Sequence, residues 1–279
     1  MEFEIRHEDL VGSFEQKKAL VSKFNLMDDT FFAVVMEDKE ACEYLLSELL
    51  GKQIKVIENK TQYSLRNIEN HSIVLDAMIE DEDHKLYDVE IQIGDHKNHS
   101  RRMRYYHTAI DWSYLEKGSD YEQLPELYMI FISAFDPFGE NENHYEVKQY
   151  VGTKEYDDGI RRLYFNTAVD DGTKISDLLQ YLKNSMADNN KFGALSKAVN
   201  FYKVENKGVD YMCKAVEEYA KKQRLEGRNE GRIEGKIEGK IEGNVKTVKN
   251  MLNEGLSLET ALKFTELDKE TYEKYAERV

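Results

Sequence analysis

The sequence has little cysteine, no long apolar run and no excess of positive charge. Its two cysteines, Cys42 and Cys213, lie far apart and match no metal-binding or redox spacing. A disulfide framework is therefore not expected, and the chain suits a reducing cytoplasm. No apolar run approaches the roughly 20 residues that span a membrane. The first ten residues, MEFEIRHEDL, are too polar for a signal peptide. We therefore expect a cytoplasmic protein without a membrane segment.

The formal net charge is −15 in 279 residues. This balance argues against a general nucleic-acid coat protein, which presents a basic surface. It leaves a metal-dependent nuclease open, because bound ions partly neutralise an acidic cluster. The motifs of several other enzyme classes are missing, since there is no glycine-rich phosphate loop, no G-x-S-x-G elbow and no H-E-x-x-H pair. The function therefore depends on how charge is arranged locally.

The most informative segment runs from Ser72 to Gly94, SIVLDAMIEDEDHKLYDVEIQIG, and predicts two strands joined by an acidic turn. Asp76 and Glu90 are each seven residues from Asp83, so a regular hairpin places them opposite one another. Strand alternation puts both carboxylates and Gln92 on one face and leaves an apolar face with Val89, Ile91 and Ile93. Two opposed carboxylates beside an amide form a candidate divalent-metal site, because hard cations take oxygen ligands. The same spacing also fits an exposed polar face on a half-buried sheet.

The rest of the first 220 residues alternates between helical and strand patterns. Apolar residues at three- and four-residue steps predict a helix within 24–50, which Gly51 ends, and another at 100–116. The continuous apolar run LYMIFISAF at 127–135 predicts a strand buried on both faces. Further strands are predicted at 53–63 and 162–167, and mostly helix at 175–220. This order predicts an α/β or α+β sandwich.

The composition changes after Lys222, where residues 225–243, LEGRNEGRIEGKIEGKIEG, repeat a four-residue unit. Five glycines lower helix stability by about 1 kcal/mol each relative to alanine. However, a Gly-xxx-Gly row beside isoleucines would let two such helices approach closely. The repeat therefore predicts either a self-associating helix or a flexible linker. The following tail predicts two or three short helices, with Asp268 as a candidate cap.

A basic cluster follows the acidic hairpin within fifteen residues of Glu90. It interleaves basic and aromatic side chains, namely Lys97, Arg101, Arg102, Arg104, Tyr105 and Tyr106. Arginines near a helix N-terminus suit phosphate binding. The alternative is ordinary surface ion pairing with the acids of the hairpin turn, Glu80, Asp81, Glu82 and Asp83.

From Asn25 to about Asn166 the sequence resembles the PD-(D/E)XK nuclease-superfamily transposases, also called the recombination-promoting nuclease family. Five segments carry the resemblance in order: MDDTFFAVVM at 27–36, VLDAMI at 74–79, YDVEIQ at 87–92, RRMRYY at 101–106 and FDPFG at 135–139. The Glu-Gly repeat followed by a short helical tail is also typical of that family.

The resemblance implies roles for individual residues. Asp76 resembles the first core aspartate and Glu90 the second metal-binding acid, which would hold Mg²⁺ or Mn²⁺ together with the Ile91 carbonyl. Gln92 stands where the wider superfamily has lysine, and this family commonly has glutamine there. Asp28 resembles an acid supplied by the first helix, with Asp29 as the adjacent candidate. The helix after the hairpin would contact DNA phosphates through Arg101, Arg102, Arg104 and Tyr106.

The implied fold is a PD-(D/E)XK restriction-endonuclease-like α/β core, with a central mixed sheet flanked by helices and a helical C-terminal extension. The expected domains are a nuclease-like domain at 1–222, with its core at 24–167 and a helical extension at 175–222, a Glu-Gly repeat helix or linker at 223–243, and a short helical tail at 244–279.

The implied function is a Mg²⁺-dependent DNA endonuclease of the transposase type in a bacterial cytoplasm, forming a homo-oligomer through residues 225–243. One alternative is a catalytically weak or inactive nuclease fold that binds DNA or protein, because Gln92 brings no positive charge. A second is an acidic interaction scaffold or regulatory factor. Metal-dependent DNA cleavage, DNA binding without cleavage, or neither would distinguish the three.

Overall fold

The computed structural model describes residues 10–65, 73–95 and 97–276. Two compact units divide the chain, Met1–Glu217 and Glu218–Val279. Residues 1–9 of the predicted polar start and Ser72, the first residue of the predicted hairpin, lie outside the described residues.

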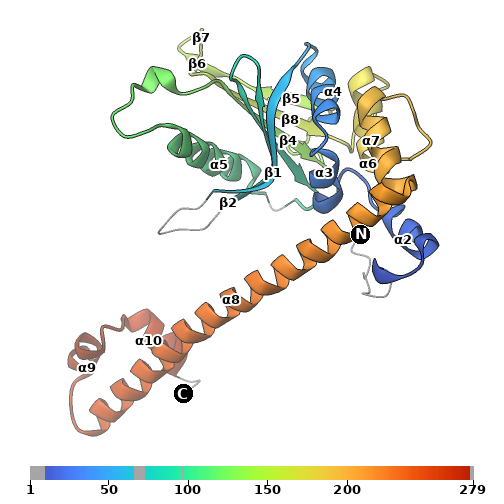
Figure 1. Ribbon diagram of the computed structural model, residues 1–279. Helices are drawn as coiled ribbons and strands as arrows, with labels where there is room; N and C mark the ends of the chain where they lie inside the picture. Colours follow the sequence, from blue (N-terminus) through green and yellow to red (C-terminus); the bar gives the residue numbers. More distant parts are fainter. Residues whose placement is uncertain (1–9, 66–72, 96, 277–279) are drawn as a thin grey trace. The chain divides into compact units, whose positions relative to one another are not determined.

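The first unit contains a six-stranded mixed sheet with the strand order β1-β2-β3-β4-β8-β5. The first three strands pair antiparallel, β3, β4 and β8 run parallel, and β5 pairs antiparallel with β8. The strands are β1 (Val56–Leu65), β2 (Ile73–Asp81), β3 (Leu86–Gln92), β4 (Leu127–Ser133), β5 (His144–Val147) and β8 (Ile160–Asn166). A separate small hairpin joins β6 (Gln149–Val151) and β7 (Lys154–Tyr156). Helices flank this sheet (Figure 1), which confirms the predicted fold class.

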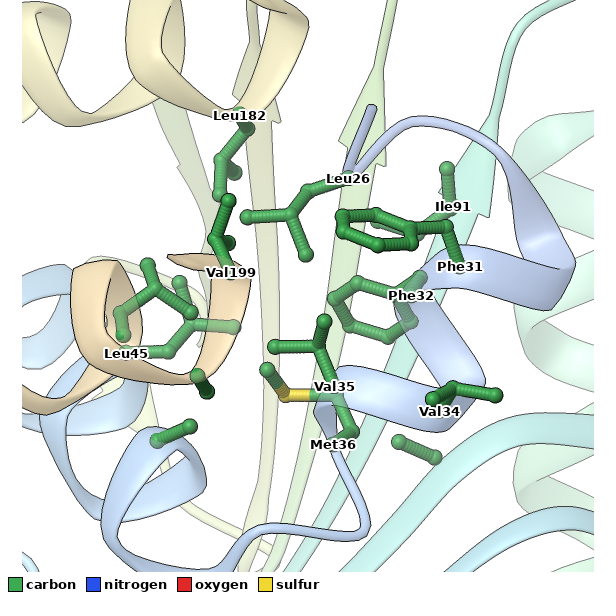
Figure 2. Close-up of a cluster of buried hydrophobic side chains, with 14 of the residues drawn as sticks. Leu26, Phe31, Phe32, Val34, Val35, Met36, Leu45, Ile91, Leu182 and Val199 are labelled. Carbon is green, nitrogen blue, oxygen red and sulfur yellow. The ribbon is translucent and has the colours of Figure 1, made fainter. Parts of the chain in front are cut away.

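One face of the sheet packs on most of the helices of the first unit. These are α2 (Phe14–Val21), α3 (Asp29–Val35), α4 (Lys39–Leu50), α6 (Lys174–Asn184), α7 (Gly193–Val204) and the start of α8. Tyr87, Val89 and Ile91 of β3 enter this core, and Figure 2 shows Ile91 beside Phe31 of α3. Fully burying one such side chain stabilises the fold by about 1.5–3 kcal/mol. Alternate residues of β3 therefore anchor the strand to these helices.

The opposite face is covered by α5 (His99–Tyr114). Met103 and Ile110 of this helix pack with Met129 and Phe131 of β4. Because side chains alternate along a strand, the residues between the apolar anchors of β3 are directed to this second face. They are Asp88, Glu90 and Gln92, so the fold buries acidic groups beneath α5.

The segment 24–50 forms two helices where one continuous pattern is predicted. The Asp38 carboxylate accepts a hydrogen bond from Ala41 N at 3.1 Å and starts α4 as its cap. Gly51 ends α4 with φ of 63°, as predicted, in a conformation that favours glycine. The short strands β5, β6 and β7 are not predicted, because their mostly exposed side chains show no apolar alternation.

The second unit holds the remainder of α8 (Asn206–Asn253), together with α9 (Leu258–Thr265) and α10 (Lys269–Ala276). The repeat at 225–243 is helical despite its glycines. A Cβ atom added at any of these glycines would meet no atom within 4 Å, so the row adjoins open space. A small core forms around Val245, Leu267 and Tyr275. Asp268 accepts a hydrogen bond from Thr271 N at 2.8 Å, as expected of a cap.

Candidate active site

Two carboxylates bridge the point where the backbone ladder between β2 and β3 stops. The described ladder runs from Glu80 opposite Leu86 to Ala77 opposite Val89. At the next position the Asp76 amide donates to Glu90 Oε1 at 3.1 Å. The Ile91 amide donates to Asp76 Oδ2 at 2.9 Å. Side-chain oxygens therefore take the place of backbone partners, and this brings Asp76 and Glu90 together as the hairpin spacing predicts.

The turn that connects the strands is held by Asp81. Its Oδ1 accepts hydrogen bonds from the amides of Asp83 and Lys85 at 3.0 and 2.9 Å. Its Oδ2 accepts from the Tyr87 hydroxyl at 2.6 Å. Because register in a hairpin is set by its turn, this network determines which residues meet at the far end of the ladder.

Burial makes the two carboxylates difficult to ionise. Asp76 is 8% exposed and Glu90 2%. Burial raises the pKa of Asp76 to about 7, and the nearby charge of Asp29 adds to this shift, whereas the hydrogen bond from Ile91 and the charge of Arg102 oppose it. Burial, followed by the charges of Asp88 and Asp76, also raises the pKa of Glu90. The site therefore favours positive charge or protons near these oxygens.

Asp88 is an acidic residue of this site that the sequence analysis did not single out. It is fully buried, and neither carboxylate oxygen has a hydrogen-bond partner among the described residues. Burial, with the charge of Asp76, raises its pKa well above the usual range. Strand alternation predicts the position of Asp88, because a residue two positions before Glu90 lies on the same face of the strand.

Arg102 is the cation that α5 supplies to this site. Its Nη2 lies 3.0 Å from Glu90 Oε2, and its Nη1 donates to Gln92 Oε1. The Gln92 amide donates in turn to the Gly94 carbonyl at 3.1 Å. The ring of Tyr106, one turn further along α5, lies 5.0 Å from the Arg102 guanidinium. One side chain therefore spans the acid and the amide and is itself held by a cation–π contact.

The two acids at the start of α3 have different surroundings. Asp28 precedes the helix, and its Oδ2 accepts a hydrogen bond from Asn25 N at 2.7 Å. The charges that act on Asp29 are those of Arg102 and Asp28, and Asp29 in turn raises the pKa of Asp76. Asp28 therefore holds the turn before α3, while Asp29 lies within electrostatic reach of the carboxylate pair.

The other two predicted phosphate contacts, Arg101 and Arg104, are exposed on α5. The structure does not bring them into the carboxylate site, where Arg102 lies. Their position leaves both guanidinium groups accessible to a ligand that approaches the start of α5.

Hard oxygen donors, a buried setting and a nearby cation are the components of metal-assisted phosphoryl chemistry. Within residues 10–65, 73–95 and 97–276, no group of three or more acidic, histidine or cysteine side chains is arranged so that it could hold a metal ion. Asp76 and Glu90 still supply two carboxylates, and one or two carboxylates commonly hold a divalent cation when water and substrate oxygens complete its shell. The buried Asp88 lies on the same face, and burial disfavours its charged form, so a nearby cation would favour its ionisation.

A mixed sheet with paired acids where two strands part defines a nuclease-like α/β protein. Comparison with family models gives the family itself, because the model of the PD-(D/E)XK nuclease family transposases matches residues 30–169. The chain belongs to this family, which indicates a nuclease-type function. No curated protein and no solved structure was found to match. None of the helices that the structure describes has the length and apolar character needed to cross a membrane.

Proposed function

We propose that the protein is a DNA endonuclease that depends on Mg²⁺ or Mn²⁺ and hydrolyses phosphodiester bonds. The observation that carries this proposal is the pairing of Asp76 and Glu90 across the parted strands, with Arg102 bound to Glu90. Asp76, Glu90 and the Ile91 carbonyl would hold the ion. When bound, such an ion acts as a Lewis acid and lowers the pKa of a water.

The remaining steps belong to this chain's own side chains. Gln92 can orient a water but carries no charge. Arg102 places a fixed positive charge at the same amide and can stabilise the extra negative charge of a phosphate under attack. Asp29 of α3 would add a third negative charge near the carboxylate pair and so strengthen its attraction for a cation. The exposed Arg101 and Arg104 would bind neighbouring phosphates and hold the DNA along α5.

The decisive experiment is metal-dependent nicking of supercoiled plasmid by wild type, Asp76→Ala and Glu90→Ala. Both variants should lose at least about a hundredfold in rate, because each removes an ion ligand. Asp83→Ala is the matched control, since Asp83 is an exposed carboxylate in the turn of the same hairpin. Equal nicking by all four proteins would eliminate the proposed site.

Variants of two arginines distinguish a role in the chemical step from a role in DNA binding. Arg102→Ala should lower kcat, because Arg102 lies among the carboxylates. Arg104→Ala should mainly raise KM and make binding less sensitive to salt. Similar effects of the two changes would contradict the distinct roles proposed for them.

A DNA-binding protein without catalysis is the second candidate. It is favoured by the ion pair between Arg102 and Glu90, which occupies an oxygen that an ion would share. Salt-sensitive DNA binding without cleavage in Mg²⁺ or Mn²⁺ would support this candidate over the first.

The proposal includes a homo-oligomer formed through the repeat at 225–243. In the repeat each glycine follows a glutamate, and the first four precede a basic residue, as in Glu238-Gly239-Lys240. Two parallel helices that face each other through their glycine rows set the glutamate side of one against the basic side of the other. An antiparallel pair sets glutamate against glutamate. Charge complementarity therefore favours a parallel pair.

Circular dichroism and light scattering on the chain with and without 225–243 would test this association. Loss of helicity and a fall in mass are expected on deletion. The matched variant Gly235→Leu keeps the length and should lower the oligomer mass without loss of helicity, because one leucine in the glycine row prevents close approach. An unchanged mass in both proteins would contradict association through the repeat.

A further inference from the structure

A hollow of about 770 Å³ lies near the C-terminal end of α5, well separated along the helix from Arg102. Its apolar lining comes from Trp112 and Leu115 of the helix end and from Tyr121 and Leu124 of the segment that follows. About ten residues, or roughly 15 Å of helix, separate Trp112 from Arg102. The hollow is thus a second surface on the helix that supplies Arg102.

Two aromatic side chains line this hollow while remaining largely in solvent. Trp112, the single tryptophan of the chain, is 84% exposed, and Tyr121 is 79% exposed. Neither ring contributes to a described hydrophobic core of the first unit. Exposed tryptophan and tyrosine around a hollow mark an interaction site, because each has a large apolar face and a polar edge.

The charge around the hollow is negative. Asp111 and Glu116 line it, against one lysine, Lys117. Asp111 Oδ2 lies 2.7 Å from His107 Nε2, whereas Glu116 is exposed. Two more acids, Asp120 and Glu122, follow on the exposed segment beside Tyr121. The start of α5 carries three arginines, so the two ends of this helix present opposite charge.

We infer that this hollow binds an arginine side chain of a basic partner protein. The guanidinium stacks on the face of Trp112, where the ring quadrupole attracts a cation, and its N–H groups donate to the Glu116 carboxylate. The planar fork of arginine matches a carboxylate and an aromatic face at once. A nucleic-acid strand is disfavoured here, because four carboxylates repel its phosphates. Binding at this hollow requires no nuclease activity.

The single tryptophan gives a direct test with the full chain. Trp112 fluorescence is followed during titration with a short Arg-Gly repeat peptide, a matched Glu-Gly peptide and an oligothymidylate. The arginine peptide should produce a saturable change that weakens as salt is added. A response to the oligothymidylate in place of the peptide, or no response to any probe, would overturn the inference.

Calorimetry with variants locates the binding site. Trp112→Ala and Glu116→Gln should each weaken peptide binding by about tenfold, the scale of one lost cation–π contact or charged pair. Tyr150→Ala is the control, because Tyr150 is an aromatic residue with 58% exposure on the separate β6–β7 hairpin. Since all three side chains are exposed, the variants should keep the wild-type circular dichroism spectrum. Unchanged affinity in Trp112→Ala and Glu116→Gln would refute the site.

Discussion

The two faces of β3 are equally buried and chemically opposite. Tyr87, Val89 and Ile91 on one face are at most 3% exposed, and Asp88 and Glu90 on the other are at most 2% exposed. Burial stabilises the fold through the apolar set, because it removes hydrocarbon from water. The same burial opposes ionisation of the acidic set and raises the pKa of both carboxyl groups. One face of β3 therefore anchors the strand, while burial of the acidic side chains on the other face lowers the stability of the fold.

The largest change in the free energy of unfolding is expected from a substitution in the core that packs on the anchoring face. Phe31 is fully buried against β3 and belongs to the main core. Phe31→Ala should lower the free energy of unfolding by about 3–5 kcal/mol, through lost transfer energy and the cavity that remains. Denaturant unfolding measures the change, with Val151→Ala as the control because Val151 is 67% exposed. A loss below about 1 kcal/mol would show that this face is not tightly packed.

Removing a charge from the acidic site should stabilise the fold, whereas removing a side chain from the anchoring face destabilises it. Asp76 of β2, which is hydrogen-bonded to Glu90 of this face, has a pKa of about 7 in the fold against a usual 3.8. The folded protein therefore binds a proton that the unfolded chain has lost, and stability falls as pH rises between these two values. In metal-free buffer Asp76→Asn should raise the free energy of unfolding by on the order of 4 kcal/mol near pH 8 and change it little near pH 4. Destabilisation near pH 8 would mean that the Asp76 carboxylate holds the strands together more than its burial weakens them.

A divalent cation should offset part of the cost on the acidic face. Adding Mg²⁺ at about ten times its Kd should stabilise the wild type by about 1.4 kcal/mol. Thermal unfolding with and without MgCl₂ measures this, and NaCl of equal ionic strength is the control. Glu90→Gln should abolish the response, because it removes a proposed ligand. An equal rise in Tm in that variant would place the bound ion elsewhere.

Local pattern predicts the two faces of β3 well. The seven-residue spacing around Asp83 anticipates that Asp76 and Glu90 meet, and alternation anticipates the apolar face of Val89 and Ile91. The same alternation predicts Ile93 on that face, but Ile93 lies beyond the strand and is 49% exposed. Asp88 could have been found by the same alternation. These features depend only on geometry within a hairpin.

Features that depend on long-range packing were not predictable in the same way. The pairing of β3 with β4 and of β4 with β8 joins segments far apart in sequence. Asp29, and not Asp28, acts electrostatically on Asp76, and this depends on where α3 begins, because Asp28 is engaged by the hydrogen bond from Asn25 N. The reach of Arg102 to both Glu90 and Gln92 depends on how α5 crosses the sheet. Membership of the nuclease family is predicted from the resemblance of sequence segments, and the match to the family model confirms it.

The smallest effect is expected at the turn of the same hairpin, and it determines what the Asp76 result means. The whole chain carries a net charge of −15, so removing any one carboxylate could stabilise the fold by lowering general repulsion. Glu82→Gln makes the same charge change at an exposed position in the turn. If burial is the cause at Asp76, Glu82→Gln should shift the free energy of unfolding by less than about 0.5 kcal/mol at either pH. If Glu82→Gln raised the free energy of unfolding near pH 8 as much as Asp76→Asn, both effects would be due to net charge. Burial of the acidic side chains would then not explain the destabilisation at Asp76.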